Sequence, residues 1–329
     1  MQSGGAVGAE RCLFLNVFQP TAASSVPLPI MFWIHGGGMK SGSSDDYNGT
    51  ELAARHNVLV VTINYRLGPL GYWGSTELER GNGLMNGLHD QIVALRWVQA
   101  NGRKFGADPA AVTIYGESAG GQSTCALTVS PAAAGLFHRT VIQSGACTGP
   151  WSPGTTSHAL NKSATFAAKL GAPTLAAMRK LPVEAIFKDS SSGGFGAGSW
   201  APDDGLVFPD AVRRPIDYYK KGQMNTMEIM IGGNSMDGLG AYFMPKSLPV
   251  AAYKSAMQEQ WGAEHWSAVA AQYPLEPRFF GDTNAAFISP LGDCDVVCSQ
   301  YQLATIISSQ GGHAFVYYFD YVNTSCSCA

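Results

Sequence analysis

The chain has 329 residues, of which 46% are hydrophobic and 14% charged, with a formal net charge of −3. This composition predicts a soluble, folded protein with a large buried core, and it excludes extensive disorder. The small negative charge offers no electrostatic basis for binding nucleic acid or an anionic membrane surface, so a neutral or small substrate is favoured.

Apolar runs bounded by turn residues predict buried strands at residues 29–34, 58–64, 112–115, 140–143, 228–231 and 314–321. Apolar residues at helical spacing predict helices at 88–101, 119–129 and 253–273. Strands that alternate with helices indicate an α/β fold with a mostly parallel sheet and helices on both faces. We expect one domain over residues 1–329, in which the serine- and glycine-rich stretch 189–199 is a flexible loop.

No stretch reaches the roughly 18 uninterrupted apolar residues of a membrane span, and residues 1–10 lack the pattern of a signal peptide. The seven cysteines make an odd number, so at least one is expected to be free. Three sequons favour a secreted glycoprotein, although such triplets also arise by chance. The sequons begin at Asn48, Asn161 and Asn323.

The strongest catalytic signal is Ser118, which lies between Gly116 and Gly120 directly after an apolar strand and before a helix-forming run. This is the context of a nucleophile elbow, a sharp turn that needs small residues on both sides of the serine. The following helix places partial positive charge beside the nucleophile, and the backbone N–H of Ala119 is an expected oxyanion donor. A Gly-x-Ser-x-Gly sequence alone would equally fit an ordinary glycine-rich turn.

A second signal lies upstream, where an apolar strand ends in His35 followed by three glycines. Glycine lets the backbone approach a ligand without obstruction by a Cβ atom. We therefore predict that Gly36 and Gly37, together with Ala119, form an oxyanion hole, in which each donor lowers the barrier by about 3 kcal/mol.

Several further stretches accompany these two motifs in a fixed order. Over residues 12–321 the chain resembles the type-B carboxylesterase and cholinesterase family of the α/β-hydrolase fold. The stretches that carry the resemblance are 12–17 (CLFLNV), 35–38 (HGGG), 64–71 (NYRLGPLG), 86–91 (NGLHDQ), 94–98 (ALRWV), 106–109 (GADP), 116–121 (GESAGG) and 143–145 (QSG). The resemblance implies hydrolysis of a small or lipid-like carboxylic ester through an acyl-enzyme, with no metal and no cofactor.

The resemblance also implies a catalytic acid at Asp237, which follows the predicted strand 228–231 where the family usually carries Glu. An Asp-Gly turn without catalytic function is the alternative. Glu117 and Ser144 are candidates for a supporting shell around Ser118, with a purely structural role as the alternative. Arg66 and Asp90 are interpreted as structural residues.

No histidine of this chain matches the family position of the triad base, which follows the last predicted strand. Only His265 and His313 come after Asp237, and His313 is a weak fallback for the base. The family also carries further strands and a cysteine before the segment that matches Cys12. We therefore expect a fragment truncated at both termini, in which Cys12 and Cys298 lack disulfide partners.

The sequence is also compatible with two alternatives to an active esterase. One is a non-catalytic relative that serves in cell adhesion, a class that typically loses the elbow serine. The other is an inactive fragment that lacks the triad histidine. The sequence does not indicate the oligomeric state.

Overall fold

The computed structural model describes residues 8–21, 24–78, 83–145, 148, 156–188, 207–208, 215–226, 228–235, 237, 248–276 and 281–320. Its strands are β1 (Leu15–Phe18), β2 (Leu28–Ile34), β3 (Leu59–Ile63), β4 (Ala107–Glu117), β5 (Arg139–Gln143), β6 (Glu228–Asn234) and β7 (His313–Phe319). They form one seven-stranded sheet in the order β1-β3-β2-β4-β5-β6-β7. Strand β1 is antiparallel to β3, and every other neighbouring pair is parallel.

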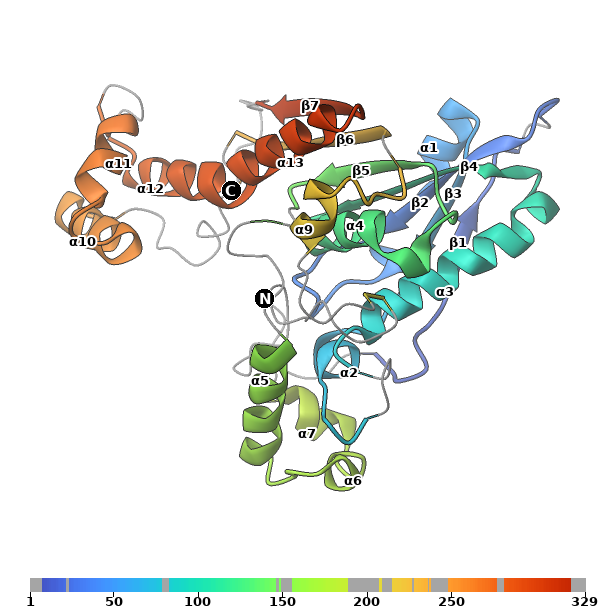
Figure 1. Cartoon of the computed structure of the whole chain (residues 1–329), viewed down its shortest axis with the longest axis horizontal. Helices are drawn as coiled ribbons and strands as arrows, with labels where there is room; N and C mark the ends of the chain where they lie inside the picture. The colour runs from blue at the N-terminus through green and yellow to red at the C-terminus, as the bar shows by residue number, and fades with distance from the viewer. Residues whose placement is uncertain are drawn as a thin grey trace.

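Helices flank this sheet (Figure 1), so the predicted α/β architecture is confirmed. The helices are α1 (Thr50–His56), α2 (Gly68–Tyr72), α3 (Asn86–Asn101), α4 (Ala119–Val129), α5 (Thr156–Lys169), α6 (Leu175–Met178), α7 (Val183–Lys188), α9 (Pro215–Lys220), α10 (Val250–Trp261), α11 (Trp266–Gln272), α12 (Thr283–Gly292) and α13 (Cys298–Ser309). Short 3₁₀ turns occupy Ser44–Asp46, Gly102–Phe105 and Pro131–Ala133, and a π-helical turn at Asp293–Val297 joins α12 to α13.

The predicted helix over 253–273 was wrong in one respect, because it is two helices. Helix α10 ends at Trp261, and Gly262 follows with φ +82° and ψ 150°, a positive-φ conformation that glycine adopts readily and that does not continue a helix. Helix α11 begins at Trp266. Strand β1 was not predicted, and neither were helices α1, α2, α5, α6, α7, α9, α12 and α13. The stretch 189–199 lies outside the described residues.

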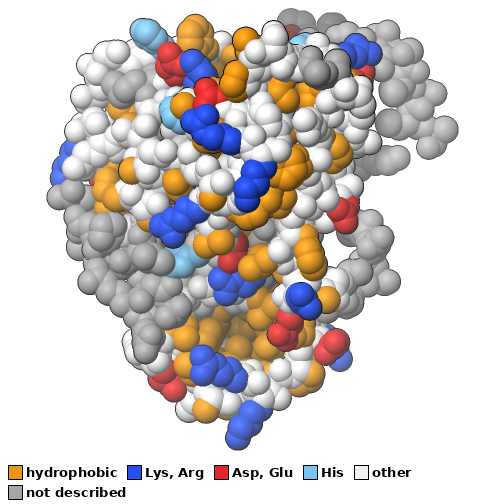
Figure 2. Space-filling model, turned by 90° about the vertical axis from the view of Figure 1, so that its right-hand side faces the viewer, with side chains coloured by type: hydrophobic (Ala, Val, Ile, Leu, Met, Phe, Trp, Pro, Cys, Tyr) orange, Lys and Arg blue, Asp and Glu red, His pale blue; other side chains and the backbone are white. Residues whose placement is uncertain are grey.

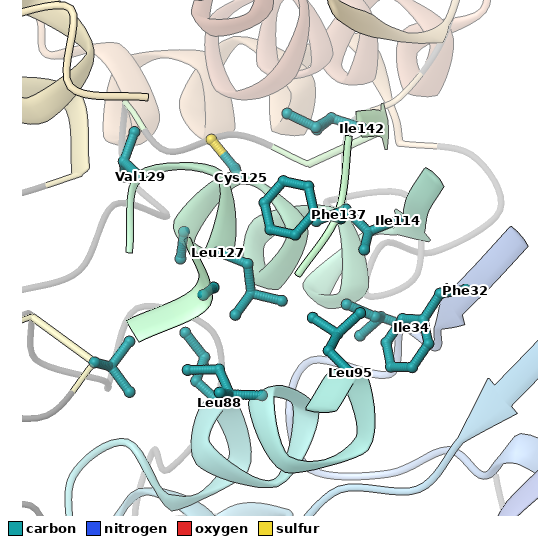
Figure 3. Close-up of a cluster of buried hydrophobic side chains, with 14 of the residues drawn as sticks. Phe32, Ile34, Leu88, Leu95, Ile114, Cys125, Leu127, Val129, Phe137 and Ile142 are labelled. Carbon is teal, nitrogen blue, oxygen red and sulfur yellow. The ribbon is translucent and has the colours of Figure 1, made fainter. Parts of the chain in front are cut away.

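The main core lies between the sheet and helices α3 and α4. This core includes Leu88 and Leu95 of α3, Phe32 and Ile34 of β2, and Ile114 of β4. In Figure 3, Leu95 points toward Phe32 and Ile34. All five side chains are fully buried. Every residue of α4 is buried, so this helix is enclosed by the rest of the fold. The sheet and α4 therefore form a fixed support for the loops at the strand ends.

On the face shown in Figure 2, Lys and Arg side chains are interspersed with Asp and Glu and form no continuous basic stripe. None of the helices in the described ranges is long and apolar enough to cross a membrane. Of the four described cysteines, Cys12, Cys294 and Cys298 are free, as expected for Cys12 and Cys298, whereas Cys125 is not.

An ion pair between a partly exposed arginine and a buried aspartate joins the loop after β3 to α3. The Arg66 guanidinium donates to both carboxylate oxygens of Asp90, at 2.8 and 2.9 Å, and the Arg66 backbone N–H donates to the same carboxylate at 2.9 Å. The Asp90 side chain is 6% exposed. This arrangement supports the structural interpretation of both residues.

We predict that Asp90→Ala lowers the free energy of unfolding by about 3 kcal/mol, because it leaves a cation and a backbone N–H without their acceptor. Glu51→Ala is the control, since Glu51 pairs with Arg55 on the surface, where both side chains are 72% exposed. Its cost should be about 0.3 kcal/mol. Urea denaturation followed by circular dichroism measures both, and equal midpoints for the two variants would contradict the prediction.

Candidate active site

The order of strands in the sheet indicates where a ligand would bind. The chain passes from β2 outward to β3 and then returns across β2 to form β4, so the connections after β2 and β4 leave in opposite directions. In parallel sheets, ligands bind outside the carboxyl ends of the strands at such a reversal. The glycine turn follows β2 and Ser118 follows β4, so both predicted motifs lie at this point.

Ser118 is the turn residue between β4 and α4, with φ 54° and ψ −120°. A positive φ is uncommon for a residue with a side chain and carries strain that the surrounding structure must hold. The Ser118 N–H donates to the Gln143 carbonyl oxygen at 2.9 Å, and the Ser118 carbonyl accepts from the Gln122 N–H at 2.9 Å. No described group hydrogen-bonds to the Ser118 hydroxyl.

The glycines around Ser118 are required by close backbone contacts. A Cβ atom on Gly116 would lie 2.6 Å from the Gly120 carbonyl carbon and 2.7 Å from the Ile34 carbonyl oxygen. A Cβ atom on Gly120 would overlap that same Ile34 oxygen, and one on Gly121 would lie 2.8 Å from the Gln143 oxygen. The elbow therefore depends on backbone atoms that approach more closely than any side chain would allow.

The glycine turn after β2 lies directly against the elbow. A Cβ atom on Gly36 would lie 3.2 Å from the Ser118 Cβ and 2.7 Å from Glu117 Oε2. Gly37 and Gly38 have φ +98° and +64°, values that favour glycine. Ala119 is the first residue of α4, so its N–H has no acceptor within the helix. The structure thus brings Gly36 and Ala119 to either side of Ser118.

His35 stabilises the start of the glycine turn. Its ring is 1% exposed and stacks on Tyr65 with the ring centres 4.4 Å apart, and its Nδ1 hydrogen-bonds the Gly36 carbonyl oxygen at 2.8 Å. The Tyr65 hydroxyl donates to the His35 carbonyl at 2.8 Å. Burial lowers the pKa of His35, which keeps the imidazole neutral. These contacts give His35 a structural role.

Asp237 follows β6 and is fixed by the end of that strand. Its Oδ2 accepts from the Asn234 backbone N–H at 2.9 Å, and a Cβ atom on Gly233 would lie 2.5 Å from the same oxygen. Burial raises the pKa of Glu117, and the negative charge of Asp237 raises it further. The carboxylates of Glu117 and Asp237 are therefore close enough for their charges to interact.

Ser144 also lies at this edge of the sheet, with φ 48° and its N–H donating to the Gly232 carbonyl oxygen at 2.8 Å. Gln300 of α13 was not predicted to contribute, yet its buried side-chain amide donates to that same Gly232 oxygen at 2.8 Å. Gln300 lies 68 residues beyond Gly232 in the chain, so no local sequence pattern could have indicated this contact.

His313 lies at the amino ends of the parallel strands, whereas Ser118 lies at their carboxyl ends. His313 is the first residue of β7 and pairs with Glu228, the first residue of β6, whereas Asn234 pairs with Phe319 at the carboxyl edge. His313 and Phe319 are six residues apart along β7, which corresponds to about 20 Å between the two ends of the strand. This position argues against the fallback assignment of His313 as the base. All seven histidines lie in the described ranges, and none hydrogen-bonds to Ser118.

No group of three or more His, Cys, Asp or Glu residues in the described ranges is arranged to hold a metal ion. The site instead consists of a strained serine, backbone donors and two carboxylates. Such an arrangement suits attack by a hydroxyl on a carbonyl carbon, with the developing negative charge stabilised by backbone N–H groups.

Substitution of Gly120 tests the packing of the elbow. We predict that Gly120→Ala lowers the free energy of unfolding by about 3 kcal/mol or more, since its methyl group would overlap the Ile34 carbonyl oxygen. Gly102→Ala is the control, because its Cβ would meet only the ends of the Ile30 and Pro109 side chains, at 3.1 and 3.5 Å. Thermal unfolding measures both, and comparable melting temperatures would show that the backbone can move apart.

Comparison with known proteins gives a family for the whole chain. The model of the carboxylesterase family matches residues 1–328. Liver carboxylesterase 1 of Mus musculus is 37% identical over 243 residues, which are 69% of this chain and 42% of that protein. The medium-chain fatty acyl-CoA hydrolase precursor of Anas platyrhynchos is 50% identical over 139 residues, or 42% of this chain and 24% of the relative.

Para-nitrobenzyl esterase of Bacillus subtilis is 48% identical over 140 residues, which are 42% of this chain and 28% of the enzyme. The matches therefore span less than half the length of each of these relatives. The family model, in contrast, covers nearly every residue here, including both glycine motifs and the Asp237 turn. On this evidence the chain belongs to the carboxylesterase family.

Proposed function

We propose that this protein is a serine hydrolase that cleaves carboxylic esters through an acyl-enzyme on Ser118. The observation that carries the proposal is the strained Ser118 turn, with φ 54°, packed against Gly36 and followed by the first residue of a buried helix. A strained turn of this kind is retained where the exposed side chain has a chemical task. Membership of the carboxylesterase family supports the same reaction.

In the proposed mechanism, the Ser118 oxygen attacks the ester carbonyl, and a tetrahedral oxyanion forms. The N–H groups of Gly36, Gly37 and Ala119 stabilise that oxyanion, aided by the positive end of the α4 dipole. The triad base takes the Ser118 proton and returns it to the leaving oxygen, so that collapse of the intermediate expels the alcohol and leaves an acyl-Ser118. Water then hydrolyses this acyl-enzyme to the carboxylic acid and free Ser118. No cofactor or metal takes part in these steps.

Asp237 is the proposed acid, which would hold the imidazole of a triad base in the correct orientation. Glu117 and Ser144 support the site around it: Glu117 lies beside the glycine turn, and the Ser144 N–H joins the ends of β5 and β6. Since none of the described histidines contacts Ser118, the base is not assigned to any residue of this chain.

The proposed substrate is a small or lipid-like ester. The names of two relatives, a medium-chain fatty acyl-CoA hydrolase precursor and a para-nitrobenzyl esterase, refer to a fatty acyl chain and to a substituted benzyl group. Secretion and glycosylation remain predictions from the three sequons. Disulfide bonding is also a proposal, since Cys147, Cys326 and Cys328 lie outside the described residues.

A non-catalytic adhesion domain is the second candidate, and it predicts no chemistry at Ser118. The retained strain at Ser118 and the glycine turn packed against it favour the enzyme, because a binding domain has no need of either. Covalent labelling of Ser118 separates the two candidates directly.

We predict that a fluorophosphonate probe labels Ser118 in the natural gene product that contains this chain, and that Ser118→Ala abolishes labelling and lowers ester turnover by about 10⁴-fold or more. Ser255→Ala on helix α10 is the control and should leave both unchanged. Mass spectrometry identifies the labelled residue, and a label on any other residue would overturn the assignment.

The 329-residue chain by itself should hydrolyse p-nitrophenyl esters only slowly, because loss of the triad base typically costs on the order of 10⁶ in rate. Added imidazole should accelerate labelling of Ser118 if the serine lacks only its base. A fast rate without imidazole that disappears in His313→Ala would reinstate His313, contrary to its position in β7.

Asp237 provides a separate test of the acid. In the gene product, Asp237→Asn should lower kcat by about 10⁴-fold while leaving the fold intact, and Asp237→Glu should keep much of the activity. Asp282→Asn is a matched control, since the Asp282 carboxylate likewise accepts backbone N–H groups, at the start of α12. Near-normal turnover in Asp237→Asn would exclude the proposed role.

A further inference from the structure

The three glycines of the glycine turn are tethered at both ends to the segment that follows β3. At the first end, the Tyr65 hydroxyl donates to the His35 carbonyl oxygen at 2.8 Å. At the second end, the Gly68 N–H donates to the Met39 carbonyl oxygen at 2.7 Å. Glycine has more conformational freedom than any other residue, so the two tethers limit the shapes that this turn can take.

Met39 is a buried residue at the end of an otherwise exposed turn. Lys40 and Ser41 donate their backbone N–H groups to the Gly37 carbonyl oxygen, both at 3.1 Å, and these hydrogen bonds close the turn. Both donors belong to exposed residues, whereas Met39 is fully buried and is part of the main core. The Met39 side chain therefore anchors the turn to the core.

The backbone of Met39 is strained. Its φ is +60°, a left-handed value at which a Cβ atom crowds the following carbonyl oxygen. Glycine would adopt this conformation without strain, as Gly37 and Gly38 do beside it. Because the chain carries methionine here instead, the burial of its side chain must offset the strain.

The segment that receives the Met39 carbonyl is itself fixed. Gly68 is buried at the start of α2, and a Cβ atom on Gly68 would lie 3.1 Å from the Phe187 ring of α7. Two residues earlier, Arg66 makes three hydrogen bonds to the Asp90 carboxylate of α3. The tether therefore connects the glycine turn to helices α2 and α3, which carry none of the proposed catalytic groups.

We propose that Met39 is a positioning residue, which fixes the oxyanion donors Gly36 and Gly37 through its buried side chain and its carbonyl group. Such donors are effective only if they are already in place when the negative charge develops. This inference rests on the proposed function for its effect on catalysis. Its structural part, the fixing of the glycine turn, is measurable without any activity.

The first experiment is amide hydrogen exchange on the folded chain, followed at the N–H groups of Lys40, Ser41 and Gly68. Met39→Ala removes the anchor, so these three amides should exchange about tenfold faster than in the wild type. Met257→Ala is the matched control, because Met257 is equally buried but lies on α10 in a separate hydrophobic cluster. It removes the same atoms from a core and should leave the three amides unchanged.

Two further substitutions separate the anchor from the strain. Met39→Gly removes the side chain but relieves the strained backbone, so it should be more stable than Met39→Ala and still show the faster exchange. Met39→Leu keeps an apolar side chain of similar volume, so exchange should stay within about twofold of the wild type. If Met39→Ala does not fold, these two variants make the same comparison.

The second experiment measures kcat and KM for a p-nitrophenyl ester in the gene product. Misplaced donors weaken binding of the transition state more than binding of the ester, so Met39→Ala should lower kcat about tenfold and leave KM within about twofold. Met39→Leu should keep a kcat close to that of the wild type, and Met257→Ala should change neither constant.

Wild-type exchange at the three amides in both Met39→Ala and Met39→Gly, or equal changes in Met257→Ala, would overturn the inference. A merely structural role for Met39 would lower the amount of folded protein without lowering kcat per folded molecule, and this result would overturn it as well. Failure of the proposed function has a different signature. In that case wild-type Ser118 would not react with a fluorophosphonate, while the exchange difference between Met39→Ala and Met257→Ala would persist, and only the catalytic part of the inference would be overturned.

Discussion

The contact between the end of strand β2 and the first turn of helix α4 determines how Ser118 lies against the glycine turn. The Ile34 carbonyl oxygen lies where a side chain on Gly120 would be, and Gly116 has no more room on the other side of Ser118. Helix α4 can approach the sheet this closely only because both positions are glycine. The same approach brings the turn after β2, with Gly36 at its start, against the Ser118 side chain.

The electrostatic character of the site follows from this arrangement. The N-terminus of α4 supplies positive potential at Ser118, whereas Glu117 and Asp237 place negative charge nearby. The raised pKa of Glu117 means that its ionised form is disfavoured in the folded protein. The protonated form of Glu117 is favoured by folding. The stability that this form contributes is fully present below the pKa of Glu117 in the unfolded chain, and it is lost as the pH rises through the raised pKa of the folded protein. The site retains this carboxylate despite its cost to stability at neutral pH, which is typical of functional residues.

The sequence predicted the parts of the site that depend on neighbouring residues. The Ser118 elbow and the triple glycine each have a local steric requirement, and those requirements leave glycine at fixed offsets in the chain. The tether between Met39 and Gly68 could not be predicted in this way, because it joins two separate segments of the chain and depends on a turn residue that is buried and strained. The same limit applies to the fold. Six of the seven strands were expected from their apolar runs, whereas the four half-buried residues of β1 form no such run.

The contacts between the strands also explain why the geometry of the Ser118 turn does not depend on the triad base. Backbone hydrogen bonds between β4, β5 and β6 hold Ser118, Gln143 and Gly232, and the Asn234 N–H holds the Asp237 carboxylate. None of these hydrogen bonds involves a histidine. The elbow and the acid turn can therefore keep their geometry whether or not a base is in place. In the proposed mechanism, binding of an ester and stabilisation of its oxyanion depend on the first set of contacts, whereas transfer of the Ser118 proton depends on the base and on the acid that orients it. A chain of this kind would hold an ester in the reactive geometry and still turn it over slowly, so binding and turnover are distinct measures of what these residues do.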